Sequence, residues 1–456
     1  MPTGRAFDRQ TARTERMLSG PILGALLGLT GGNILFAVGQ IAAQGAEAWY
    51  VGLLGVEALA AVALAYPMVV LMQMMSAGAM GGAVNGAVAR AMGAGNKAEA
   101  AGLAIHAIVI ALVAATAWVV VMLGFGATVV DLFGASDNVH SLALAYIGIV
   151  FVGAPGVWLA NTLASVVRGV GAMSFASNAI FVAFAVQIVV GAGLTLGIGP
   201  VPSLGLEGAA YGHLLGFGTA SMLLAGYLVS GRTGLTFDRE TLRLSRARFH
   251  TILRIGAPAL ISPVMSVATV LIATALIARH GADALAGYGL GARLEMIMVP
   301  LVFAVGTALT TMVGANVGAG SIERARRVAW TGGLLATAAT GLVGLTVWIA
   351  PDLWLGLFTA DAAARNAGAL YFHRTGLTYG FLGFGLAVFF ASLGAGLTFR
   401  PTVAVVSRTV VVAVAGLALA SDGPGGVYLA VAAGMATLGL VNIWGLAHPQ
   451  WRTRAK

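Results

Sequence analysis

The sequence predicts an all-α membrane protein of twelve transmembrane helices, arranged as two pseudo-symmetric lobes of six helices each. Three observations predict this architecture: few charged residues, twelve long apolar stretches, and short motifs that recur at a nearly constant distance along the chain. Hydrophobic residues make up 59% of the 456 residues, and only 9% are charged. Soluble domains carry roughly 25% charged residues, so lipid must surround most of this chain.

Twelve apolar stretches are long enough to cross a bilayer, which takes about 20 residues of helix. The six in the first half of the chain are expected at residues 21–46, 56–89, 101–124, 139–165, 173–197 and 205–229. The six in the second half are expected at residues 255–278, 284–314, 328–350, 367–392, 401–420 and 426–446. The second and eighth stretches are longer than a bilayer requires, so we expect these helices to tilt, bend or protrude.

The basic residues indicate how the chain is oriented. An even number of spans places both termini on one side. With that side cytoplasmic, most of the 25 lysines and arginines fall on the cytoplasmic side. This asymmetry is the positive-inside pattern, so we expect a multi-pass protein of the cell (inner) membrane with both termini in the cytoplasm. The net charge of +9 follows from this topology, and the dispersed bases form no patch typical of nucleic-acid binding.

The two halves of the chain share motifs, which indicates an internal repeat. Gly93-Ala94-Gly95 recurs as Gly318-Ala319-Gly320, and Gly169-x-Gly171 recurs as Gly394-x-Gly396, both with an offset of 225 in residue number. Two further motifs recur with offsets of 225 or 226. Each half holds an even number of spans, so the halves have parallel topology and are related by an axis along the membrane normal.

The repeat divides the chain into three parts. The first six-helix lobe covers residues 1–230, a cytoplasmic linker rich in arginine covers 231–254, and the second lobe covers 255–456. Membrane proteins built from such repeats are commonly secondary transporters, which bind their substrate between the halves and rock one half against the other. The sequence therefore predicts alternating access rather than a passive channel.

Four motifs carry a resemblance to a known family. They are Gly52-x-x-Gly55-x-Glu57-Ala58-Leu59-Ala60, Arg168-Gly169-x-Gly171, Arg293-x-Glu295 and Val313-Gly314-Ala315-Asn316-x-Gly318-Ala319-Gly320. As an ordered set they resemble the multidrug and toxic compound extrusion (MATE) family. The resemblance implies a V-shaped, two-lobe antiporter that exports amphipathic, often cationic, organic compounds in exchange for protons or sodium ions.

The chain departs from the family pattern at several positions. The family commonly has an aspartate five residues before Gly52, where this chain has Glu47. Many members have an Asn and an Asp on the fifth helix, and the matching positions here are Gln187 and Gly191. One branch has a Glu on the seventh helix, where Ser266 stands, and an Asp on the tenth, where only neutral residues stand. Ion and substrate details of any branch therefore do not transfer directly.

Glu47 is the predicted ion-coupling residue. With Glu295, it is one of two acidic residues within an apolar span or at its deep edge, where an unpaired charge costs about 3 kcal/mol or more. Asn33, Gln40, Gln44 and Glu47 are 7, 4 and 3 residues apart, which places them on one helix face, with Gln40 and Gln44 as polar support. Alternatively, these groups only bond neighbouring helices and hold the lobe together.

Protons are favoured over sodium ions as the coupling ion. A proton needs one titrating carboxylate, whereas a dehydrated hard cation needs several oxygen ligands that converge on it. The first lobe lacks the usual fifth-helix Asp, because Gly191 stands at that position. Sodium remains the alternative.

The substrate is expected in the cleft between the lobes, lined by Asn33, Met68, Met72, Arg293 and Glu295. Flexible thioethers suit surfaces that accept varied apolar ligands, although single methionines are more often packing residues. Because the two deep carboxylates are acidic, we expect neutral or cationic amphipathic substrates.

Glu295 has two interpretations. Arg374, on the tenth span, could pair with it in a structural or gating ion pair, or Glu295 could attract a cationic substrate. The alternative function is a flippase for a lipid or a lipid-linked saccharide, in the same wider superfamily. A flippase for a diphosphate headgroup would need a strongly cationic cavity, and only Arg293 and Arg374 are expected well inside the spans.

The sequence does not predict an enzyme. It has no cysteine, no His-Glu-x-x-His metal motif, no P-loop lysine motif and no nucleophile beside a base. We expect no metal and no other cofactor. The expected partners are small organic substrates and membrane lipid, and the expected state is a monomer.

Overall fold

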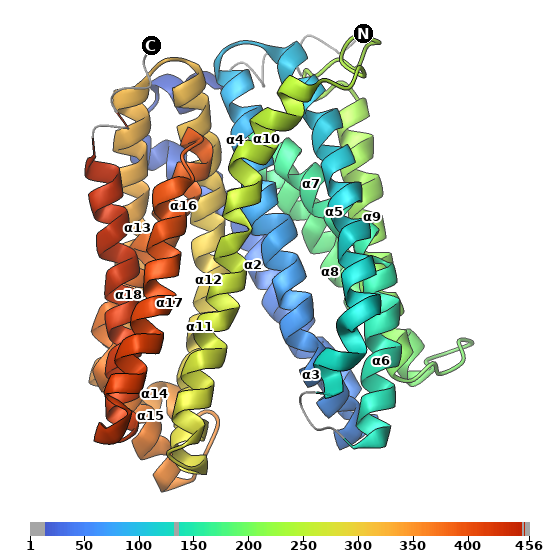
Figure 1. The fold of residues 1–456 in the computed structure, drawn as a ribbon. Coiled ribbons are helices and arrows are strands. Elements are labelled where there is room, and N and C mark those ends of the chain that lie inside the picture. The colour runs from blue at the N-terminus through green and yellow to red at the C-terminus, as the bar shows by residue number, and fades with distance from the viewer. Residues whose placement is uncertain (1–13, 132–135, 449–450, 452–456) are drawn as a thin grey trace.

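The computed structural model describes residues 14–131, 136–448 and 451, and these residues are almost entirely helical. Figure 1 shows the helices gathered into two bundles that run side by side. Strands are absent from the described residues, as expected for a chain whose backbone groups must bond within each span in lipid.

The first lobe contains the helices of the first half of the chain. They are α2 (Ile22–Gly52), α3 (Val56–Gln73), the π-helix η1 (Met74–Met80), α4 (Gly81–Gly93), α5 (Lys97–Asp131), α6 (Asp137–Val152), α7 (Ala154–Gly169), α8 (Met173–Leu196) and α9 (Leu206–Val229). The π-helix joins α3 and α4 into one continuous helical segment, which spans 38 residues.

The second lobe repeats this order. Its helices are α10 (Arg246–Ala259), α11 (Ile261–Ala278), α12 (Ala282–Gly318), α13 (Ile322–Ile349), α14 (Asp352–Leu355), α15 (Ala362–Thr375), η2 (Gly376–Thr378), α16 (Tyr379–Ala395), α17 (Phe399–Ala418), η3 (Ala420–Asp422) and α18 (Pro424–Ala447). Here α12 is the counterpart of α3, η1 and α4 together, and it spans 37 residues.

Twelve spans are confirmed when one bent pair of helices is counted as a single span. Eleven segments of the described chain are long and apolar enough to cross a membrane, and α6 with α7 form a twelfth that bends by 47°. The bend follows from Gly153 and from Pro155 at the start of α7, because proline has no amide proton for the helical hydrogen bond.

Two of the expected boundaries that differ from the structure bear on the function. The seventh helix begins at Arg246, so the last part of the expected linker 231–254 is already helical. The first helix continues to Gly52, beyond the expected end at residue 46. Glu47 therefore lies inside this helix and not at its edge.

The two lobes meet at one end of the molecule and diverge toward the other, which gives the expected V shape (Figure 1). The end where they meet also holds the linker 231–245, and we call it the termini end; the opposite end is the far end. At the termini end α4 packs against α12 and α16, and α2 packs against α12.

Glycine brings α4 and α12 into close contact around a pseudo-two-fold axis. A Cβ added to Gly314 would lie 2.9 Å from the Cβ of Ala89, and Ala89 is the residue that matches Gly314 in the repeat. A residue that touches its own repeat equivalent lies on the symmetry axis. The neighbouring contacts are reciprocal, because Gly93 packs on the backbone of Ala315 and Gly318 packs on the backbone of Arg90.

Polar contacts add to this junction. The Asn33 side chain, from α2, donates to the Thr307 hydroxyl at 2.8 Å and to the Ala304 carbonyl at 3.1 Å, both on α12. Thr311 donates to the Asn85 side-chain oxygen at 2.8 Å. These groups are buried, so separating the lobes here would leave several polar atoms unpaired unless water replaced the partners.

Candidate functional site

Glu47 lies in the far half of α2, half-buried within the first lobe. Its carboxylate accepts a hydrogen bond from the Tyr146 hydroxyl of α6 at 2.7 Å and one from the Gln187 amide of α8 at 3.1 Å. None of the ion pairs among the described residues includes Glu47. The carboxylate is thus held by two neutral donors from two other helices.

Gly191 belongs to the same site. A Cβ at this position would lie 2.7 Å from the Tyr50 hydroxyl, so a larger residue would displace the tyrosine. The Tyr50 hydroxyl is buried and has no hydrogen-bond partner in the described part of the chain. Tyr50 therefore fills the space that a larger side chain at position 191 would need.

Glu295 occupies a comparable environment in the second lobe. Its carboxylate, on α12, accepts a hydrogen bond from the Tyr371 hydroxyl of α15, and Arg408 of α17 is close enough to interact with it electrostatically. The expected pairing of Glu295 with Arg374 is wrong, because Arg374 is exposed and forms no ion pair with Glu295. Arg374 follows Tyr371 by three residues on α15, but its side chain is exposed, whereas that of Tyr371 is fully buried.

The tyrosines that bond the two carboxylates are repeat equivalents, but the two glutamates are not equivalent to each other. Tyr371 is the repeat equivalent of Tyr146, so equivalent tyrosines bond the two carboxylates. At the positions that match Glu47 and Glu295 in the opposite halves, the chain has Ile272 and Val70. Each lobe therefore builds its own carboxylate–tyrosine pair from a different helix.

The polar stripe predicted on the first helix does not act as one unit. Asn33 is buried in the junction between the lobes, Gln40 is half-buried and Gln44 is exposed. Neither glutamine hydrogen-bonds to Glu47 within the described residues; the amide that does so is Gln187 of α8. Helical spacing places residues on one face but does not identify which neighbouring helix supplies a partner.

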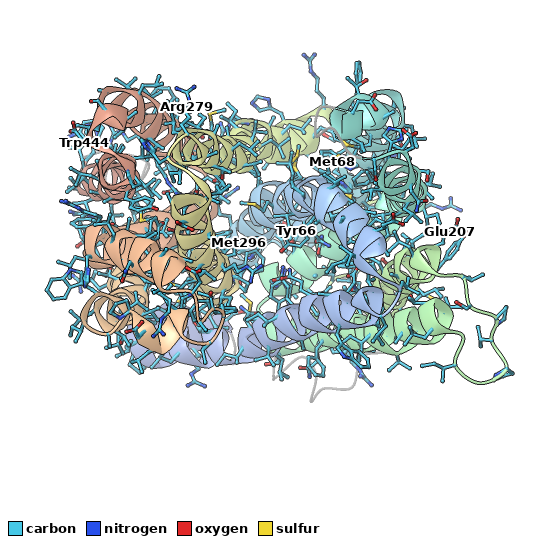
Figure 2. The ribbon with its side chains drawn as sticks, turned by 90° about the horizontal axis from the view of Figure 1, so that it is seen from below. Tyr66, Met68, Glu207, Arg279, Met296 and Trp444 are labelled. Atoms are coloured by element: carbon cyan, nitrogen blue, oxygen red, sulfur yellow. The ribbon has the colours of Figure 1, made fainter. Side chains whose placement is uncertain are left out.

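The other residues predicted to line the cleft lie in different surroundings. Met72 is fully buried in the core of the first lobe and Met68 is 7% exposed. Arg293 is exposed and its guanidinium lies 5.7 Å from the Phe358 ring centroid. From the far end, Figure 2 shows Met68 of α3 and Met296 of α12 on either side of the line between the lobes, and Met296 is 45% exposed.

Two deep arginines were missed by the sequence interpretation. Arg168, near the end of α7, is 2% exposed, and its guanidinium carbon lies 5.6 Å from the ring centroids of Phe36 in the first lobe and Phe303 in the second. Arg408, in the middle of α17, is 8% exposed. The Nε atoms of both arginines are buried and have no hydrogen-bond partner among the described residues.

The expectation that only Arg293 and Arg374 lie well inside the spans is therefore wrong. For Arg408, the sequence already held the signal, because the expected span 401–420 includes it. Arg168 follows the expected span 139–165, but helix α7 continues to Gly169. The expected span ended too early to include Arg168.

The sequence matches a known protein family along most of its length. The sequence model of the MatE family matches residues 34–192 and, a second time, residues 258–418. The chain belongs to the MATE family. The second match starts and ends at nearly the same offset from the first as the repeated motifs do, so the two matches also reproduce the predicted internal repeat. Both carboxylate–tyrosine pairs lie within the matched segments.

Relatives of this MATE protein carry different functional names. The "FAD transporter" of Shewanella oneidensis is 25% identical over 315 residues, which cover 68% of this chain and 69% of the relative. The "Probable multidrug resistance protein NorM" of Thermotoga maritima is 24% identical over 380 residues, which cover 81% and 78% of the two chains. The "Probable multidrug resistance protein YoeA" of Bacillus subtilis is 23% identical over 332 residues, or 72% and 71%.

Solved structures confirm the fold of this MATE protein. A MOP superfamily transporter from Pyrococcus furiosus, described as having a binding pocket of reverse polarity, superposes with a TM-score of 0.88 at 22% identity, covering 97% of this chain and 98% of the other. An outward-facing multidrug resistance MATE family transporter superposes with a TM-score of 0.87 at 22% identity, covering 94% and 96%.

Tyr146→Phe tests whether the tyrosine holds the Glu47 carboxylate. Hydrogen bonds to charged groups contribute about 1.5–3 kcal/mol, so we expect the free energy of unfolding in detergent to fall by an amount in this range. The matched control is Tyr66→Phe, because Tyr66 lies close enough to interact with Glu47 but its hydroxyl donates no hydrogen bond to a described residue. Equal losses in both variants would contradict the assignment.

Proposed function

We propose that this MATE transporter is a secondary active antiporter, which exports amphipathic organic compounds in exchange for protons by alternating access. The observation that carries the proposal is the Glu47 carboxylate, placed inside a membrane span and bonded by Tyr146 and Gln187 without a basic partner among the described residues. A charge in that position is costly unless it is hydrated or paired, and a proton neutralises it.

Helix α2 offers a direct route from the ion site to the lobe junction. Glu47 bonds helices of the first lobe, whereas Asn33 of the same helix bonds Thr307 and Ala304 of the second lobe. The two residues are about 21 Å apart along the helix at 1.5 Å per residue. Protonation of Glu47 removes the charge that its two donors stabilise, and a resulting shift of α2 against α6 and α8 would act on the junction at the other end.

The arrangement of the lobes fits one state of this cycle. The lobes are joined at the termini end and diverge toward the far end, so with cytoplasmic termini this is an outward-facing state. Glu47 lies in the half of α2 toward the far end, where it would take its proton from outside. After Glu47 takes up a proton, closure of the far end would convert the transporter to its inward-facing state.

Protons fit the Glu47 site better than sodium ions do. The contacts that surround the carboxylate are a hydroxyl and an amide that donate hydrogen bonds to it, whereas a hard cation needs several oxygen atoms directed at one point. Gly191 supplies no side-chain oxygen. Sodium coupling would require Tyr146 and Gln187 to turn their lone pairs toward the ion.

A second candidate concerns the charge of the transported compound. Arg168 is buried, lacks a partner for its Nε atom and forms no ion pair in the described part of the chain, and a buried cation favours an anionic partner. This observation favours an anionic amphipathic compound over the cationic substrates expected from Glu47 and Glu295 alone. Transport of matched anionic and cationic dyes by the purified protein in vesicles distinguishes the two.

Glu47→Gln tests the coupling mechanism. The amide mimics the protonated carboxylate, so we expect the variant to fold normally but to lose uphill efflux driven by a proton gradient in reconstituted vesicles. Glu47→Asp should retain part of the activity, because it keeps the titrating group. The control is Glu295→Gln, which removes the carboxylate of the other lobe.

The outcomes separate the alternatives. If Glu47→Gln exports substrate uphill at the wild-type rate, the mechanism is wrong and Glu295 becomes the coupling residue. If the wild-type protein responds to a sodium gradient but not to a proton gradient, the coupling ion is sodium.

The proposed orientation can be tested by cysteine labelling, because the chain has no cysteine of its own. Glu240, in the exposed linker at the termini end, and Val201, in the exposed loop between α8 and α9, are suitable positions. We expect a membrane-impermeant maleimide to label Val201→Cys in intact cells and to label Glu240→Cys only after the membrane is opened. The reverse pattern would contradict cytoplasmic termini.

A further inference from the structure

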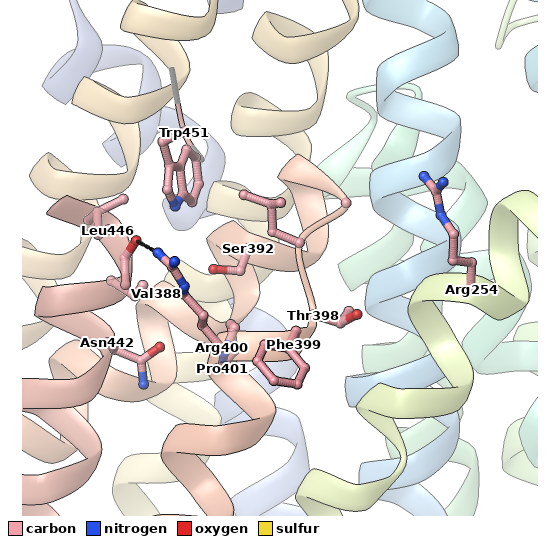
Figure 3. Close-up of a pocket in the computed structure, with 13 residues that line it drawn as sticks. Arg254, Val388, Ser392, Thr398, Phe399, Arg400, Pro401, Asn442, Leu446 and Trp451 are labelled. Carbon is pink, nitrogen blue, oxygen red and sulfur yellow. Dashed lines mark hydrogen bonds between the residues drawn. The ribbon is translucent and has the colours of Figure 1, made fainter. Parts of the chain in front are cut away.

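A cavity of about 340 Å³ lies in the second lobe, away from both carboxylates, where α16 ends and α17 begins. Figure 3 shows Ser392, Arg400, Asn442 and Trp451 gathered around it, with Arg254 of α10 at the opposite side. None of the lining residues is acidic, and two are arginines. The cavity therefore has a positive charge.

Two buried polar side chains line this cavity. Ser392 is 3% exposed, and its hydroxyl forms no hydrogen bond with any described residue. Asn442 is 2% exposed, and its amide nitrogen donates to the Leu438 carbonyl at 2.9 Å while its side-chain oxygen has no partner within the described chain. Neither oxygen is among the fully buried atoms that lack a partner, so both oxygens remain accessible from the cavity that their residues line. They are available to an occupant that forms hydrogen bonds.

Arg400 and the first turn of α17 supply further donors. The guanidinium reaches the Gly445 carbonyl at 3.5 Å and stacks 4.7 Å from the Trp444 ring centroid, which leaves most of its five N–H groups available. No described side chain caps the start of α17 at Thr398. Free amides at the start of a helix favour an anion.

The first lobe has no such site at the equivalent place. By the offset of the repeat, Ser392 and Arg400 match Val167 and Phe175. The last helix of each lobe has 24 residues, and counted from its start Asn442 matches Leu224. Three apolar residues thus stand where the second lobe has a serine, an arginine and an asparagine, so general features of the repeated fold do not explain the polar cavity.

Exposed aromatic residues place the cavity at the level of lipid headgroups. Phe399 is 78% exposed and Trp444 is 59% exposed, and both adjoin Arg400. Exposed aromatic side chains at the ends of membrane helices are typical of the interface between lipid and water. Basic pockets between helices on the cytoplasmic side commonly bind anionic headgroups.

From these observations we infer that the cavity binds the phosphate group of an anionic phospholipid from the leaflet at the termini end. Arg400, the start of α17 and the Ser392 hydroxyl donate to phosphate oxygens, and the acyl chains leave along the exposed aromatic residues. Arg254 belongs to α10, which packs against α4 of the first lobe. A lipid held between Arg254 and Arg400 would therefore tie α10 to α17 in this conformation.

The test measures lipid binding to the purified full-length protein by native mass spectrometry and thermal unfolding in detergent. Phosphatidylglycerol should bind and raise the unfolding temperature, whereas phosphatidylcholine should bind at least tenfold more weakly. Arg400→Gln should weaken phosphatidylglycerol binding by about tenfold or more, since a charge-assisted bond contributes about 1.5–3 kcal/mol. Ser392→Ala should weaken it several-fold and provides a second test if Arg400→Gln does not fold.

The matched control is Arg239→Gln, which removes the same charge from an exposed site in the linker at the same end. Equal losses for Arg239→Gln and Arg400→Gln would overturn the proposal, because the effect would then be general electrostatic attraction. Equal binding of the two lipids would overturn it as well. If inorganic phosphate alone produces the full stabilisation, the cavity is a site for soluble phosphate and the lipid assignment is wrong.

Discussion

The close packing of α4 against α12 is the constraint on which the rest of the structure depends. Glycine at positions 93, 314 and 318 lets the backbones of the two lobes touch around the pseudo-two-fold axis. A larger side chain at any of these positions would force the helices apart, because the atoms opposite are backbone or a Cβ in contact. The junction at this end determines which end of the molecule diverges, and it therefore determines the side from which the carboxylates are reached.

The two lobes have the same helix arrangement, but their buried polar and charged residues differ. Equivalent tyrosines bond Glu47 in one lobe and Glu295 in the other, but only Glu295 has a nearby arginine, Arg408, among the described residues. Glu47 is therefore the carboxylate whose charge depends on neutral donors alone, and α2 links it to the junction. The cavity at Arg400 is a second asymmetry, because apolar residues fill the matching place in the first lobe.

Much of the fold was predictable from the sequence, because a membrane span is a local property of about 20 apolar residues and the repeat is visible as a constant offset. The hydrogen-bond partners of Glu47 and Glu295 within the lobes were not predictable from the sequence. Gln187 is far from Glu47 along the chain, and helical periodicity carries no information about which distant helix packs on a given face. Arg374 lies on the expected span, but its side chain is exposed, whereas the nearby Tyr371 is buried and donates to the Glu295 carboxylate. Arg168 was missed because the depth of a residue near a helix end depends on how the lobes close over it.

The most direct test of the account is a pair of distances between spin labels, measured by double electron–electron resonance in the cysteine-free chain. Ala94 and Ala319 are exposed repeat equivalents at the termini end, and Val56 and Ala282 begin α3 and α12 at the far end. Adding Gly314→Leu to each labelled pair should lengthen the distance at the termini end and shorten the distance at the far end, because the lobes rock about the glycine contact. A longer distance at the termini end with an unchanged or longer distance at the far end would contradict it.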